Sequence, residues 1–307
     1  MKLRKTWFVL AALFVCGSTA TYGQVRLERK YIDDSTYKTE TVSKLAQTLT
    51  MLGMTTDTTV DTRAVSVGKV GQRAADGTLK VKDHVQSLTV EMTIQGMKYS
   101  FDSQNPDNKG SSPFEMLRDV HKALAQKEST VIVDQHNRVT AVELDQSFLA
   151  GLPVNVQDLV KGQLDPENLK SVVNQEHDRL PSEPVRPGDT WVRTENMNLG
   201  AGQQMTFQME YAYAGPVQQG DKSLDKITSK ILSVAFTLQK GPIPLTLKGA
   251  DLKAEKSEGT YLFDRQLGRI VDARWTGHLK GTLTFQANGM DIPSELDLTI
   301  ETAVKEQ

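Results

Sequence analysis

The sequence predicts an α+β fold that is mostly antiparallel β, with long curved sheets or half-barrels and one or two packing helices. Three observations predict it. Apolar and polar residues alternate over long segments, glycine-containing turns separate those segments, and two other segments carry proline-marked helix starts. We therefore expect the strands to form the body of the protein and the helices to pack on it.

The longest alternating segment covers residues 271–285 and predicts a strand buried on one face. At about 3.3 Å per residue it would span roughly 50 Å, far beyond the usual five or six residues, which is typical of curved sheets. We expect the bend at Gly277 and Gly281, where a missing side chain leaves room. The face expected to be buried consists of Val271, Ala273, Trp275, Gly277, Leu279, Gly281, Leu283 and Phe285.

A cluster of charged residues directly precedes this strand, in the stretch FDRQLGRIVDARWTG at residues 263–277. Because strand patterns lie on both sides, we interpret the cluster as a hairpin turn at Gly268 with solvated charges, and not as a catalytic site. Asn288–Gly289 is a second strong hairpin signal, and alternation resumes over residues 296–304. The chain is therefore expected to end as an antiparallel meander.

Three more segments have strand patterns. Residues 205–213 alternate apolar with polar side chains, and residues 79–94 do so with a change of parity that predicts a bulge near Gln86–Ser87. The threonine-rich residues 54–62 predict an exposed strand or a sheet edge.

Two segments predict helices. The first, Pro113 to Gln126, has Ser112 as its expected N-cap and should cover the apolar face of the sheet. The second begins after the cap Asp165 with Pro166 and stops before Pro181. Phe114, Leu117, Val120 and Leu124 share one face of the first helix, which is the face expected to pack.

These patterns divide the chain into four parts. We expect a signal peptide at residues 1–23, a β-rich half with one helix at 24–145, a helical and proline-rich connection at 146–190, and a β-meander half at 191–307.

The first residues have the pattern of a secretory signal, with a basic start, an apolar stretch and small residues near the cleavage point. Small residues allow cleavage after Ala20 or after Gly23. The mature chain is expected to be soluble in the periplasm or outside the cell. Cys16, the single cysteine, would leave with the signal, which excludes disulfides. Lipidation of Cys16 is disfavoured because Phe14 and Val15 precede it where a lipoprotein signal has small residues.

Composition and motifs exclude several functions. With 36 basic and 38 acidic side chains of interspersed sign, the chain lacks the basic clusters of nucleic-acid-binding proteins. It has no Gly-x-Ser-x-Gly, His-Glu-x-x-His or phosphate-binding glycine motif, and its five histidines are scattered. No apolar run suits a transmembrane helix. We therefore predict no enzyme, no cofactor, no metal site and no nucleic-acid partner.

Three stretches together resemble a known family: YSFDSQNPDNKGSSPFEML, VIVDQHNRVTAVE and PSEPVRPGDTW, the last ending at Trp191. They are similar to an uncharacterised family of secreted bacterial proteins, a domain of unknown function, and the resemblance covers most of the mature chain. Its motifs mark turns and caps, so it implies no catalytic residue. The chain has Asn137 where the family pattern has glycine, and asparagine also tolerates a left-handed turn.

Two functions remain open. The chain is either a binding or carrier module that holds a lipid or other hydrophobic molecule on a curved apolar face, or a structural or interaction protein with a filled core. Periodicity cannot separate them, because a core and a ligand pocket are lined by the same residue types. The candidate ligand-binding residues are Phe207, Met209, Tyr211, Trp275, Leu279 and Leu283.

Overall fold

The structure is a computed structural model. It describes residues 23–107, 113–126, 128–152, 154, 156–157, 161, 164–200, 202–239 and 245–306. The signal peptide with Cys16 and the expected cap Ser112 lie outside the described residues.

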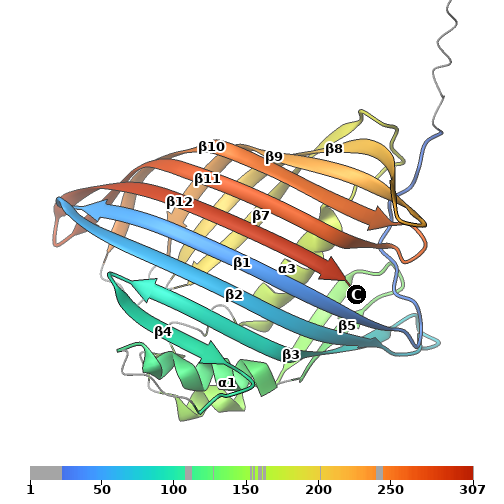
Figure 1. The fold of residues 1–307 in the computed structure, drawn as a ribbon, viewed down its shortest axis with the longest axis horizontal. Helices are drawn as coiled ribbons and strands as arrows, with labels where there is room; N and C mark the ends of the chain where they lie inside the picture. The colour runs from blue at the N-terminus through green and yellow to red at the C-terminus, as the bar shows by residue number, and fades with distance from the viewer. Residues whose placement is uncertain are drawn as a thin grey trace, which may run out of the picture.

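Within the described residues, twelve strands form one antiparallel sheet that curls around a helix (Figure 1). Eleven follow one another in the order β6-β5-β3-β2-β1-β12-β11-β10-β9-β8-β7, and β4 pairs with β3 beside β5. The predicted α+β, mostly antiparallel fold is confirmed. The strands are β1 (Thr36–Met51), β2 (Met54–Val70), β3 (Leu79–Ile94), β4 (Met97–Asp102), β5 (Glu128–Val133), β6 (Val139–Leu144), β7 (Thr190–Gly200), β8 (Gln203–Gln219), β9 (Lys222–Leu238), β10 (Thr246–Asp264), β11 (Arg269–Ala287) and β12 (Met290–Glu306).

The β1–β12 pair joins the two ends of the chain, with Leu45 opposite Ile300. The sheet therefore takes strands from both expected halves, and the division into parts stays a prediction.

The predicted turns are present. Gly268 lies in a tight turn with φ 65°, and Asn288 and Gly289 close the β11–β12 hairpin with φ of 52° and 80°. Asn137 takes a left-handed conformation, with φ 60°, between β5 and β6. The bulge is also confirmed, because Val65 pairs with Ser87 and the next residue pairs with Val85, which leaves Gln86 without a partner.

Residues 54–62 form a strand, but the alternative of a sheet edge is wrong. They belong to β2, which lies between β1 and β3, whereas β6 and β7 end the strand order and β4 pairs only with β3. Threonine suits either place, because its branched side chain packs well on any pleated surface.

The sheet bends so strongly that strands far apart in its order face each other. Phe207 on β8 and Trp275 on β11 are three strands apart, about 14 Å in a flat sheet, yet their ring centroids are 6.2 Å apart. A side chain at Gly277 would collide with the Trp275 ring, and one at Gly281 would fall 1.9 Å from the Asp251 carbonyl oxygen. Both glycines therefore allow a close approach, and bulges in the β10–β11 pairing accompany them.

The first helical segment consists of the short 3₁₀ helix η1 (Glu115–Leu117) and helix α1 (Arg118–Gln126). It packs beside β3 and β4, where Phe114 and Leu117 contact a cluster around Leu88 and Phe101. Trp275 belongs to a different cluster. The expectation that this helix covers the Trp275 face is therefore wrong, because its apolar side packs on β3 and β4, the two strands that precede it. A second short 3₁₀ helix is η2 (Ser147–Gly151).

Helix α3 (Pro166–Asp178) begins as predicted, since the Asp165 side chain accepts hydrogen bonds from the N–H groups of Glu167 and Asn168. It lies inside the curve of the sheet, between the edge strands β6 and β7 (Figure 1). No helix among the described residues is long and apolar enough to cross a membrane.

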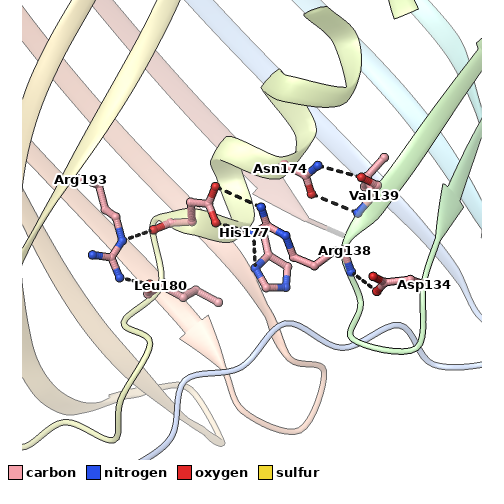
Figure 2. Close-up of polar contacts among 8 residues, drawn as sticks. Asp134, Arg138, Val139, Asn174, His177, Leu180 and Arg193 are labelled. Atoms are coloured by element: carbon pink, nitrogen blue, oxygen red, sulfur yellow. Dashed lines mark hydrogen bonds and ion pairs between the residues drawn. The ribbon is translucent and has the colours of Figure 1, made fainter. Parts of the chain in front are cut away.

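Two neighbouring amides attach α3 to both edges of the sheet. Asn174 accepts from the N–H of Val139 at 3.0 Å and donates to its carbonyl at 2.8 Å (Figure 2). Gln175 accepts from the N–H of Asn196 at 2.7 Å and donates to its carbonyl at 3.1 Å. Each amide thus occupies backbone groups that an edge strand would otherwise leave unpaired.

Candidate functional site

An apolar cavity of about 110 Å³ lies inside the curve of the sheet, and we call it the Trp275 cavity. It brings together residues from β7, β8, β10, β11 and β12 and the residue that follows α3. Its lining consists of Arg179, Glu195, Met197, Phe207, Met209, Tyr261, Ala273, Trp275, Thr302 and Val304.

Strand parity and one glycine place these side chains. Phe207 and Met209 share the inward face of β8, and Ala273 and Trp275 share the inward face of β11. The Trp275 ring lies over Gly277, within the space that a β-carbon would fill. The indole therefore lies along its own strand and leaves room beside Phe207.

The Trp275 Nε1 atom is buried and has no hydrogen-bond partner among the described residues. A buried indole N–H normally finds an acceptor, and leaving such a donor unpaired costs about 1 to 3 kcal/mol. The cavity thus has a mainly apolar wall, and Trp275 in that wall carries an unpaired N–H.

A charged pair forms the polar side of the cavity. Arg179 donates from Nε and Nη2 to the two carboxylate oxygens of Glu195, both at 2.9 Å, and Tyr211 also donates to Glu195. Burial lowers the pKa of Arg179, but Glu195 outweighs that effect and the pKa is raised. Burial raises the pKa of Tyr211. Arg179 therefore stays charged and Tyr211 stays protonated at neutral pH.

Sequence reasoning missed this pair, although one signal was present. Glu195 lies on the same parity as Trp191, Arg193, Met197 and Leu199, so the pattern places a carboxylate on a face that is mostly apolar. A charge on such a face requires a partner. The pattern does not say which arginine supplies it.

The six predicted site residues separate into two groups. Phe207, Met209 and Trp275 line the Trp275 cavity. Tyr211 stacks on Trp191, with ring centroids 5.9 Å apart, and Leu279 and Leu283 are fully packed in the main core. These last three fill space and line no part of the cavity.

A second, larger cavity of about 270 Å³ lies where the N-terminal segment passes the end of α3, and we call it the arginine cavity. Four guanidinium groups from three parts of the chain meet there, with His177 between them. The lining consists of Arg26, Leu27, Glu28, Arg29, Arg138, His177, Asp178, Leu180, Pro181, Ser182 and Arg193.

A small cavity of about 70 Å³ lies between the two, and we call it the connecting cavity. It shares Arg29 and Leu180 with the arginine cavity. With the Trp275 cavity it shares Arg179, Tyr261, Ala273 and Val304. The three cavities therefore follow one another from the end of α3 into the curve of the sheet.

Within the described part of the chain, no group of three or more His, Cys, Asp or Glu side chains is arranged to hold a metal ion.

Comparison with known families identifies part of the chain. Residues 76–218 match the model of a family of unknown function, DUF6263. The predicted resemblance to a domain of unknown function is confirmed. The DUF6263 match contains all three stretches that carry it, and extends from the start of β3 into β8. It covers less of the chain than the resemblance implied, because β1, β2 and β9 to β12 lie outside it.

Comparison with solved structures gives matches of low similarity, and no curated protein sequence matches the chain. A structure of lipovitellin, concerned with its lipid–protein interactions, has 7% identity and a TM-score of 0.48, and the match covers 91% of this chain. This chain spans only 25% of that lipovitellin chain.

Two further matches are more distant. DynF from the dynemicin pathway of Micromonospora chersina has 7% identity and a TM-score of 0.17 over 96% of this chain and 92% of DynF. A DUF1329 family protein from Desulfovibrio piger has 8% identity and a TM-score of 0.12 over 84% and 83% of the two chains. These scores are too low to carry an argument about function.

Proposed function

We propose that this protein is a non-catalytic binding module that takes up a hydrophobic ligand through the Trp275 cavity. One observation carries the proposal: a cavity lined mainly by apolar side chains lies inside the curve of the sheet. A ligand with an alkyl part would bury apolar surface there.

The size of the cavity limits what enters it. An apolar cavity of about 150 Å³ in another protein binds benzene, so the Trp275 cavity, at about 110 Å³, fits a group of a few carbon atoms. The connecting cavity extends this space toward the end of α3. The end of a single alkyl chain fits these dimensions better than a bulky ring system does.

Neutral apolar probes, 1-decanol and Nile red, test the proposal by titration into wild type, Trp275→Ala and Leu279→Ala. Both truncations should cost stability, about 2 to 5 kcal/mol. Trp275→Ala should also weaken binding, whereas Leu279→Ala should not, because Leu279 is 0% exposed and lines no part of the cavity. Absence of saturable binding to the wild type would favour the second function, a structural or interaction protein with a filled core.

We also propose that the protein works outside the cytoplasm, on the basis of the signal pattern in its first residues. N-terminal sequencing of the exported protein should find a start between Thr21 and Gln24. A lipid-modified Cys16 would contradict this.

A further inference from the structure

We propose that the arginine cavity binds the phosphate group of an anionic single-chain amphiphile whose alkyl chain lies in the connecting and Trp275 cavities. The inference rests on the proposed function and names the class of its ligand. It is carried by charge, by one unpaired donor and by the order of the cavities.

Charge is the first observation. The arginine cavity has four guanidinium groups and two carboxylates in its lining, which leaves an excess of two positive charges. A phosphate monoester carries about two negative charges at neutral pH. Guanidinium groups also match phosphate geometry better than other cations do, because their N–H groups form a planar fork.

The roles of the four arginines differ. Arg193 donates to the carbonyls of Asp178 and Leu180, and Arg138 pairs with the Asp178 carboxylate, so these two hold the end of α3 (Figure 2). Arg26 makes only a long ion pair with Glu28, at 3.7 Å, and its side chain is 59% exposed.

Arg29 lies at the boundary between the cavities. Its guanidinium is 5.1 Å from the centre of the Tyr31 ring, and the Tyr31 side chain takes one of its hydrogen bonds. Glu176 faces it across the connecting cavity. Arg26 and Arg29 are therefore the arginines with donors left for a ligand.

His177 supplies the unpaired donor. Arg138 Nη1 lies 3.4 Å from His177 Nδ1, and because a guanidinium nitrogen can only donate, Nδ1 must accept. Burial and then the charge of Arg138 lower the pKa of His177, so the ring is neutral at pH 7 and its proton lies on Nε2. Nε2 is buried without a partner among the described residues. An anion in this cavity would provide the missing acceptor.

The order of the cavities links the headgroup to the chain. Polarity falls along the row, from the arginine cavity through the connecting cavity to the apolar walls around Trp275. An amphiphile with its phosphate at Arg26 and Arg29 would direct its chain inward past Leu180 and Tyr261. A free phosphate ion would use only the first of the three cavities.

Isothermal titration calorimetry with decyl phosphate, 1-decanol and inorganic phosphate tests whether the phosphate and the alkyl chain occupy these cavities. Wild type should bind decyl phosphate at least about tenfold more tightly than 1-decanol, since one good charged hydrogen bond is worth that much. Arg26→Gln and Arg29→Gln should each remove most of this preference and leave 1-decanol binding unchanged. Because Arg26 is exposed, its variant remains a test even if Arg29→Gln fails to fold, which thermal unfolding would reveal.

Arg274→Gln is the matched control, because Arg274 is also exposed and makes a similarly long ion pair, at 3.8 Å with Asp272. It should bind decyl phosphate as wild type does. Equal affinity for decyl phosphate and 1-decanol would overturn the inference while leaving the proposed function intact. Inorganic phosphate binding as tightly as decyl phosphate would overturn it too, in favour of a site for free phosphate. If 1-decanol shows no saturable binding at all, the proposed function itself fails.

Discussion

Gly268 joins the N-terminal segment to the β10–β11 turn. Its carbonyl accepts from the Lys30 N–H at 2.9 Å, and a β-carbon at this position would lie 2.4 Å from the Lys30 side chain. The Asp264 side chain supports the turn by accepting from the N–H groups of Gln266 and Leu267. The turn therefore depends both on a left-handed backbone and on close packing.

Gly268→Val should lower the free energy of unfolding by about 1 to 3 kcal/mol from backbone strain alone, and further through the contact with Lys30. Gly289→Val is the matched control, because Gly289 also has a positive φ but open space around its β-carbon. Chemical denaturation should show the larger loss for Gly268→Val. An unchanged unfolding midpoint would contradict the assignment of this turn.

His121 gives the protein a pH dependence of known sign. Its Nδ1 lies 2.7 Å from the Tyr99 hydroxyl, and burial, followed by the charge of Arg118, lowers the pKa of His121 to about 4. Because the unfolded chain takes up this proton near pH 6.5, stability falls as the pH drops from 6.5 to 4, by on the order of 3 kcal/mol.

His121→Asn should remove that loss, and denaturation of both proteins between pH 7 and pH 4 measures the difference. Burial raises the pKa of Asp83 to about 6, so Asp83 acts with the opposite sign, but it is present in both proteins and cancels. Equal pH slopes for the two proteins would contradict the assignment.

At the scale of elements, α3 hydrogen-bonds to the strands at both ends of the sheet, β6 and β7. Asn174 and Gln175 are neighbours in sequence, yet they bind opposite edges of the sheet. This is possible because successive side chains on a helix point about 100° apart, and α3 lies between β6 and β7. The helix thereby protects the two edges against pairing with other chains.

Asn174→Ala should destabilise the protein by about 1 to 3 kcal/mol, because it leaves the Val139 N–H without its acceptor in a part-buried place. Gln175→Ala should cost less, since its bonds to Asn196 are exposed. Hydrogen exchange at the Val139 amide should accelerate in Asn174→Ala and not in Ser171→Ala, a change on an exposed part of the same helix. Unchanged exchange at Val139 in Asn174→Ala would show that this contact does not protect the edge.

At the scale of the whole molecule, the curl of the sheet creates the cavities, and this was only partly predictable. Alternation predicts which residues of β8 and β11 face inward, and it correctly places Phe207, Met209 and Trp275 on inner faces. A period of two says nothing about strand order, so it could not place β6 and β7 at the edges or set α3 between them. The same limit explains why Tyr211, Leu279 and Leu283 were indistinguishable from cavity residues.

The charged features depend on contacts between residues distant in sequence. Arg26, Arg138 and Arg193 lie on separate segments, and each alone has the pattern of a solvated surface charge. Only the curl and the path of the N-terminal segment bring them together. Sequence periodicity therefore predicted the inward-facing apolar residues of the strands better than the polar sites.

The central claim is that an apolar ligand lies beside Trp275, and contact quenching by 10-bromodecan-1-ol tests it most directly. Two proteins are compared: one retains Trp275 alone, with Trp7 and Trp191 changed to Phe, and the other retains Trp191 alone. Trp191 is the internal comparison because its ring stacks on Tyr211 and its N–H donates to the Arg179 carbonyl at 2.8 Å. We predict saturable quenching of Trp275 at one ligand per protein and much weaker quenching of Trp191. Quenching that does not saturate, or that affects both tryptophans equally, would contradict the account.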